Sequence, residues 1–163
     1  MSPRRSSAVV SAVGVGAVVL YAAVAALQIL VLNPLAAAPG RTLAEIRGEM
    51  SAAGETLNEG MALGILGVGV VIALVVAAIS IRSSAPAALT AMLFCGVLTF
   101  GAPAYFAASF GAGMGLADTY GISGGDHAPW GGVLFAVSLL AFGAAVGLAV
   151  TVGRAPRRIA APA

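Results

Sequence analysis

Residues 9–32 read VVSAVGVGAVVLYAAVAALQILVL and contain no charged side chain. Only Ser11, Tyr21 and Gln28 are polar in this run. A membrane-spanning helix needs about 20 mainly apolar residues, because the hydrocarbon layer is about 30 Å thick and each residue rises about 1.5 Å. The run therefore predicts a transmembrane helix and indicates the class of the whole chain.

Three further segments have the same character, at about residues 61–81, 86–108 and 131–152. None of them alternates apolar and polar residues, as the strands of a membrane barrel do. We therefore expect an all-α integral membrane protein. Its fold should be a single domain over residues 1–163, an antiparallel four-helix transmembrane bundle.

The composition agrees with this class. The chain is 60% hydrophobic and 9% charged, whereas an ordinary soluble domain is about 45–50% apolar and about 25% charged. Such a charge deficit excludes a soluble enzyme and a disordered tail, and a nucleic-acid binder would need clustered cations. The absence of Lys beside many Ala, Gly, Val and Arg residues is typical of a high-GC bacterial genome, so we expect a bacterial plasma membrane.

The charges predict the orientation of the spans. Six arginines lie on one side, in the tails 1–8 and 153–163 and in the link between spans two and three: Arg4, Arg5, Arg82, Arg154, Arg157 and Arg158. The loops 33–60 and 109–130 contain the remaining charges: Arg41, Arg47, Glu45, Glu49, Glu55, Glu59, Asp118 and Asp126. Cationic loops stay in the cytoplasm, so both termini should be cytoplasmic and these two loops should lie outside.

The N-terminal segment has a second interpretation. Arg4 and Arg5, the apolar run and then Ala36-Ala37-Ala38 resemble a secretory signal with an A-x-A cleavage site. A signal core has about 7–15 apolar residues, and residues 9–32 form a longer run. We therefore favour a retained first span, with cleavage as the alternative.

The first outer loop contains a helix pattern. Thr42-x-x-Glu45 matches a capping box, in which two side chains satisfy backbone N–H groups at a helix start. The apolar residues that follow recur every three or four positions: Leu43, Ile46, Met50, Ala53 and Leu57. This predicts a short amphipathic helix. It either covers the bundle as a lid, which we favour, or offers a docking surface to a partner.

The third span and the second outer loop contain helix breakers. Pro103 should kink the span or end its regular part. We expect the glycine-rich run 111–115 to end the helix completely. The loop that follows contains four candidate site residues: Asp118, Asp126, His127 and Trp130. Asp126 and His127 could bind a metal together with Asp118 or a glutamate of the first loop, but a zinc or copper site normally has more His or Cys ligands. We favour a structural role, in which Asp126 caps the fourth span and Trp130 anchors it at the lipid boundary.

The spans themselves contain no Asp, Glu, Lys, Arg or His. Ionisable residues at that depth usually mark proton- or sodium-coupled transporters, voltage sensors and bis-histidine haem proteins, so these classes are disfavoured. Gln28 and Tyr105 should both lie toward the outer third. They either form a polar pocket for a lipid or quinone head group or, as we favour, hydrogen-bond between helices.

Small residues four positions apart are the candidates for helix packing, because close backbone approach drives association in lipid. They are Gly60, Gly64, Ala91, Cys95, Gly143 and Gly147. Such pairs occur both within a bundle and between chains, and the sequence does not separate the two.

We recognise no family in these motifs, and no catalytic, metal or cofactor residue is assigned. The chain is expected to be a non-catalytic accessory, assembly or interaction subunit. Its partners should be membrane lipids and either another membrane protein or a second copy, without nucleic acid. The alternatives are a small pore or uncoupled transporter and, third, a membrane enzyme that uses the outer-loop carboxylates.

Overall fold

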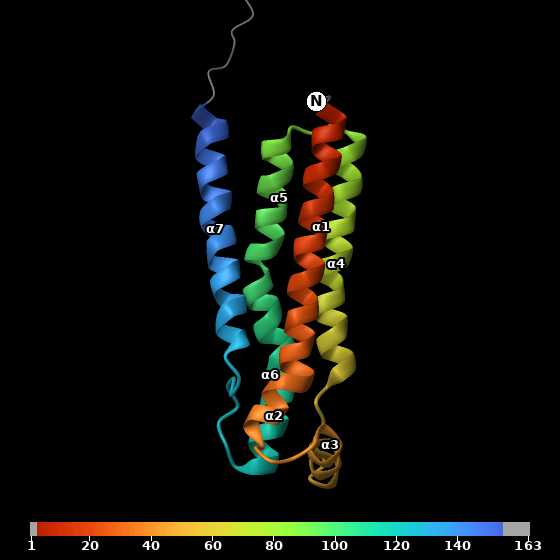
Figure 1. Ribbon diagram of the computed structural model, residues 1–163, viewed down its shortest axis with the longest axis vertical. Coiled ribbons are helices and arrows are strands. Elements are labelled where there is room, and N and C mark those ends of the chain that lie inside the picture. Colours follow the sequence, from red (N-terminus) through yellow and green to blue (C-terminus); the bar gives the residue numbers. More distant parts are fainter. Residues whose placement is uncertain (1–2, 155–163) are drawn as a thin grey trace, which may run out of the picture.

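The computed structural model describes residues 3–154, and this part of the chain consists of helices and the turns between them. Four helical segments in it are long and apolar enough to cross a membrane: Arg4–Ala37, Glu59–Arg82, Ala87–Tyr120 and Trp130–Val152. Figure 1 shows them side by side along the long axis of the molecule. The all-helical prediction and its four apolar segments are confirmed. Arg157 and Arg158, which we assigned to the cytoplasmic tail, lie outside the described residues.

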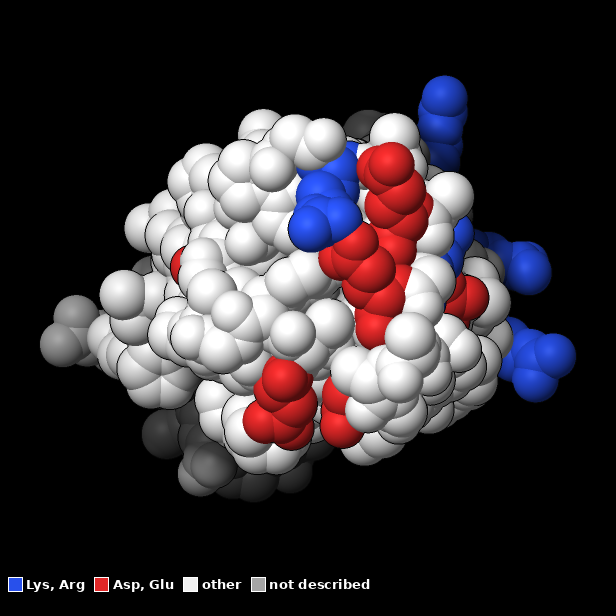
Figure 2. Space-filling model, turned by 90° about the horizontal axis from the view of Figure 1, so that it is seen from below, with Lys and Arg blue, Asp and Glu red and all other residues white. Residues whose placement is uncertain are grey.

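The elements in chain order are α1 (Pro3–Leu27), η1 (Gln28–Leu32, π-helical), α2 (Asn33–Ala37), α3 (Leu43–Ala52), α4 (Glu59–Arg82), α5 (Ala87–Thr99), α6 (Gly101–Tyr120) and α7 (Trp130–Arg154). One end of the molecule holds α2, α3 and the 121–129 segment (Figure 1). We call it the acidic end, because all six acids lie on these elements, in the α3–α4 turn or on the helix ends beside them. Figure 2 views this end, where acidic side chains stand out from a mainly uncharged surface. The start of α1 and the α4–α5 turn lie at the opposite end, with Arg4, Arg5 and Arg82.

Each long helix buries a narrow row of residues. On α1 the row alternates between steps of four and three: Ser7, Ser11, Gly14, Val18, Tyr21, Ala25 and Gln28. On α7 it is Gly131, Leu134, Ser138 and Ala141. This alternation is the seven-residue repeat of helices that cross at a shallow angle in a left-handed bundle. The remaining faces of both helices are largely exposed.

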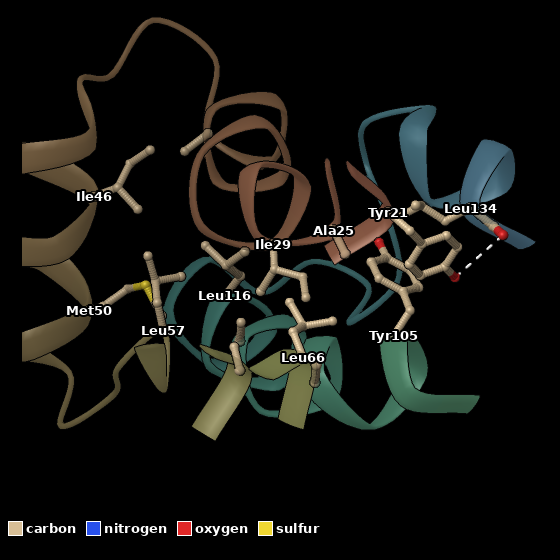
Figure 3. Packing of buried hydrophobic residues seen from close by; sticks show 14 residues of the cluster. Tyr21, Ala25, Ile29, Ile46, Met50, Leu57, Leu66, Tyr105, Leu116 and Leu134 are labelled. Carbon is tan, nitrogen blue, oxygen red and sulfur yellow. Dashed lines mark hydrogen bonds between the residues drawn. The ribbon is translucent and has the colours of Figure 1, made fainter. Parts of the chain in front are cut away.

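The main core lies toward the acidic end. Figure 3 shows Ile46 and Met50 of α3 beside Leu57, with Ile29, Leu66 and Leu116 next to them and Tyr21, Tyr105 and Leu134 further along. A separate small cluster of Val18, Ala73 and Phe94 fills the middle of the bundle.

The amphipathic helix is confirmed as α3. Thr42 is its N-cap. The Thr42 hydroxyl accepts the backbone N–H of Glu45, and the Glu45 carboxylate accepts the backbone N–H of Thr42, as a capping box requires. Ile46, Met50 and Leu57 are buried in the core, so the apolar stripe packs against the bundle as a lid. The first span is longer than the predicted 9–32, because the helix continues from α1 through η1 and α2 to Ala37.

Proline accounts for two irregularities in the long helices. Pro103 cannot donate a backbone hydrogen bond to Thr99, and α5 ends at Thr99, as the predicted kink required. Pro34 likewise cannot bond to residue 30, and the helix before it widens into the π-helical segment. There the Asn33 N–H donates to the carbonyl of Gln28, five residues back.

The predicted break at residues 111–115 is wrong, since α6 continues to Tyr120 and the loop is only 121–129. The glycines serve close packing instead. A Cβ atom on Gly113 would lie 2.3 Å from the Gly124 carbonyl oxygen, and one on Gly115 would lie 2.9 Å from that of Thr56. Glycine lowers helix propensity by only about 1 kcal/mol, and close contacts on two sides of α6 offset that cost.

We predict that Gly113→Ala destabilises the protein by about 1–3 kcal/mol, because the added methyl group must push the backbone of the 121–129 segment away. Thermal unfolding in mild detergent, followed by circular dichroism, measures the loss. Gly64→Ala is the matched control, because its Cβ would meet no atom within 4 Å. Equal stability of the two variants would contradict the close-packing role of Gly113.

The capping box predicts a pH dependence of α3. The backbone N–H of Thr42, and then its hydroxyl, donate to the Glu45 carboxylate and lower the pKa of Glu45. A lowered folded-state pKa contributes stability that is present above the ordinary value of about 4.3 and is lost as the pH falls through the folded value. Amide hydrogen exchange should therefore show α3 fraying below about pH 4.3. Glu45→Gln keeps the cap without the titration, and its α3 exchange should lose this pH step.

Candidate functional site

The four candidate residues of the second loop do not form one site. Asp126 and His127 lie in the 121–129 segment, whereas Asp118 is exposed on α6 and shares no hydrogen bond with them among the described residues. Trp130 begins α7 and is 47% exposed. No group of three or more His, Cys, Asp or Glu side chains is placed to hold a metal ion in the part of the chain that the structure describes.

Two side-chain amides at the end of α1 hold the 121–129 segment. Gln28 is fully buried, and its Nε2 donates to the Ala128 carbonyl at 3.1 Å. The Asn33 Oδ1 accepts the N–H groups of His127 at 2.6 Å and of Ala128 at 3.3 Å. We call the 121–129 segment the strap. It runs from α6 to α7 and is hydrogen-bonded to side chains of η1 and α2.

Asp126 is held by a buried tyrosine. The Tyr105 hydroxyl donates to the Asp126 Oδ1 at 2.8 Å, and Tyr105 is only 1% exposed. The other carboxylate oxygen lies where a side chain on Gly131 would begin, 1.8 Å from an ideal Cβ. Asp126 thus lies beside the first turn of α7, where the helix dipole favours an anion, as the capping interpretation expected. Its hydrogen bond, however, comes from Tyr105.

A second polar link joins α1 to α7. The Ser138 hydroxyl donates to the Tyr21 hydroxyl oxygen at 3.2 Å, and Tyr21 donates to the Leu134 carbonyl at 3.4 Å. Together with Gln28, Asn33, Tyr105 and Asp126, these residues form a polar cluster at the acidic end of the bundle. Hydrogen bonding between helices is present through Tyr21 and Ser138, whereas Gln28 and Tyr105 bond to the strap rather than to another helix.

Buried serines make a second polar region at the opposite end. The Ser7 hydroxyl donates to the Ser80 carbonyl at 2.9 Å. Ser11 and Thr90 are also buried. The apolar cluster of Val18, Ala73 and Phe94 lies between the two polar regions, since Val18 separates Ser11 from Tyr21 along the buried row of α1.

A hollow of about 100 Å³ adjoins the polar cluster between α6 and α7. It is lined by Asn33, Tyr105, Phe106, Ser109, Phe110, Gly113, Gly124, Gly125, Asp126 and Phe135. The Tyr105 and Phe135 rings meet edge to face with centroids 5.7 Å apart. The hollow thus combines one carboxylate with four aromatic rings.

The predicted packing glycines do not lie on the seams of this chain. Gly60, Gly64, Gly143 and Gly147 are all exposed, and a Cβ on any of them would meet nothing within 4 Å. On α5 the buried residues are Thr90 and Phe94, while Ala91 and Cys95 are half-buried beside them. The four-residue spacing of small side chains therefore missed the real seams, which follow the seven-residue repeat. Packing between chains remains a prediction for these glycines.

Comparisons of the chain with protein-family models, with curated proteins and with solved structures found no match. Function is therefore argued from the geometry of the described residues.

We predict that Tyr105→Phe and Gly131→Ala destabilise the protein through the same contact. The first removes the hydroxyl that binds Asp126, and the second displaces the carboxylate, so each should cost about 1–3 kcal/mol. Both substitutions break the same hydrogen bond, between Tyr105 and Asp126. The double variant should therefore lose no more free energy of unfolding than the worse single variant, as measured by reversible unfolding in detergent.

Gly132→Ala is the control for this cycle, because it adds the same methyl group one residue later in open space. Additive losses in the double variant would show that the two residues act independently.

Proposed function

We propose that this chain is a multi-pass protein of a bacterial plasma membrane and acts there as a non-catalytic accessory, assembly or interaction subunit. Its four apolar segments would form an antiparallel transmembrane bundle with both termini in the cytoplasm. The charge distribution supports this orientation. Arg4, Arg5 and Arg82 lie at one end, while Arg41 and Arg47 at the acidic end are paired with Glu49 and Glu59.

One observation carries the interaction role: exposed glycine pairs on the outward faces of α4 and α7. Gly60 and Gly64 on α4, and Gly143 and Gly147 on α7, make no close contact in their own chain. Glycine within a helix costs about 0.5–1 kcal/mol relative to alanine, and these four gain nothing within the bundle. Closely approaching helices are the setting in which such pairs are useful in lipid. The occupant would be another membrane protein or a second copy.

The alternatives receive less support from the described residues. A pore needs a polar path, and the apolar cluster of Val18, Ala73 and Phe94 separates the two polar regions. An enzyme that uses Asp118 and Asp126 together needs both in one site, whereas Asp118 does not line the hollow beside Asp126.

We predict that the intact protein, extracted in mild detergent, is recovered with a stable partner or as an oligomer by native mass spectrometry. Gly64→Leu or Gly143→Leu should lower that association at least about tenfold, because the larger side chain holds a second helix away. Neither variant should lower the thermal stability of the chain itself, since both positions are exposed and a Cβ there would meet no atom within 4 Å.

Gly16→Leu provides the control, because Gly16 is also exposed on a long helix with no neighbour within 4 Å. The proposal fails if the unaltered protein is always recovered alone and monomeric. It also fails if Gly16→Leu weakens association as much as the other two variants.

A further inference from the structure

The hollow between α6 and α7 gathers aromatic residues, of which Tyr105 belongs to the main core while Phe106 and Phe110 are exposed. Tyr105, Phe106, Phe110 and Phe135 line it, four of a small total of six Phe, three Tyr and one Trp in the chain. Phe106 is 59% exposed and Phe110 is 57% exposed, so their rings add little to the buried core. Exposed apolar side chains are common on the long helices, and what distinguishes these rings is that they line the same small hollow as a carboxylate.

The only charged side chain in the lining is Asp126. Its carboxylate takes part in no ion pair among the described residues, and Tyr105, which binds one of its oxygens, is neutral. The arginines of this end are engaged elsewhere, Arg41 with Glu49 and Arg47 with Glu59. The hollow is therefore anionic, and none of its lining residues is a cation that could pair with Asp126.

Glycine keeps the hollow open. Gly113, Gly124 and Gly125 contribute only backbone to the lining, so these three positions put no side chain into the space beside Asp126. Gly113 also lies so close to the Gly124 carbonyl oxygen that it could not be larger without moving the strap. The same close packing that holds Asp126 in place thus preserves the space beside it.

An anionic group next to several aromatic rings is the combination that recognises organic ammonium ions, because the negative faces of the rings and the carboxylate attract the same cation. A bare divalent metal is a poorer fit, since it needs six or more oxygen ligands for calcium, or an octahedral shell for magnesium, and the hollow has one carboxylate. We propose that this hollow binds a primary or quaternary ammonium group.

Such a group has two sources, the head group of a zwitterionic lipid such as phosphatidylethanolamine or a free amphipathic cation. The lipid source rests on the proposed placement in a membrane, where the exposed rings of Phe106 and Phe110 would face the acyl chains and the opening would lie near the head-group level. Binding of a free ammonium ion does not depend on that placement, so the two proposals can fail separately.

The test uses tetramethylammonium as the probe and the full-length protein in a maltoside detergent, which has no ammonium group. Saturation-transfer NMR should detect saturable binding to the unaltered chain. Asp126→Asn should weaken it at least about tenfold, because the variant keeps the shape and an acceptor for Tyr105 but removes the charge. Phe106→Leu, at an exposed position that folding tolerates, should weaken it about three- to fivefold by removing one ring.

Asp118→Asn is the matched control, because it removes the same charge from the same end without touching the hollow, and it should change binding less than about twofold. Equal weakening by Asp118→Asn and Asp126→Asn would mean general attraction to an acidic surface and would overturn the proposal. Absence of saturable binding, or unchanged binding to Asp126→Asn, would overturn it as well.

A second arm distinguishes the two sources. The same titration is run in nanodiscs of phosphatidylglycerol alone and in nanodiscs with added phosphatidylethanolamine. Competition by phosphatidylethanolamine, lost in Asp126→Asn, supports the lipid head group. Binding of tetramethylammonium that is equal in both nanodiscs supports a free cation as the occupant.

Discussion

The geometry of the acidic end depends on one irregularity, the extra residue that Pro34 introduces into the first long helix. Up to Gln28 the buried row of α1 follows the seven-residue repeat, and a regular helix would next bury residues 32 and 35. The π-helical segment shifts the row by one position, so that Ile29 and Asn33 are buried instead. Asn33 can therefore reach the backbone of the strap, and Gln28 beside it reaches the next carbonyl. A proline that costs one backbone hydrogen bond thus positions the side-chain amide of Asn33, next to that of Gln28 on the regular row.

The strap shows how an irregular segment is held in place where few side chains are available. It contains Ser123, Gly124, Gly125 and other small residues that bury little apolar surface. Its order comes from hydrogen bonds to Asn33, Gln28 and Tyr105, and from the contact between the backbones of Gly113 and Gly124. Buried backbone polar groups must find partners, and here the partners are side chains of other helices. Polar residues in the spans therefore organise the end of the bundle as well as joining helices.

Much of the fold could be predicted from hydropathy and capping, because these are local properties. The four apolar segments and the Thr42–Glu45 capping box depend on residues close together in the sequence. The glycine run of α6 could not be interpreted in this way. The same residues end a helix in solvent and serve as a packing face when another backbone lies against them, and only the tertiary contact of Gly113 with Gly124 decides between the two.

The candidate site was predictable in part, because some of its residues are marked by their local sequence. Gln28 and Tyr105 were identified as polar residues of the outer third, and Asp126 as a charge near a helix start. Asn33 was placed in a loop, although the Asn-Pro pair directly after an apolar run was a signal that the helix changes its register there. The aromatic rings could not be connected with Asp126 at all, because Phe106 and Phe135 come from helices separated by the strap.

The small-residue pairs illustrate a more general ambiguity in reading apolar helices. A seam in lipid needs close approach, and a Gly-x-x-x-Gly pair provides it whether the neighbour belongs to the same chain or to another. Within this chain the buried row of α1 instead advances in alternating steps of four and three, and it combines the small Ser7, Gly14 and Ala25 with the larger Val18 and Tyr21. The bundle therefore closes without using Gly64 or Gly143, and these positions remain as smooth outward surfaces. When the seven-residue rows account for the contacts within a chain, small-residue pairs that lie off those rows are the positions at which to look for contacts between chains.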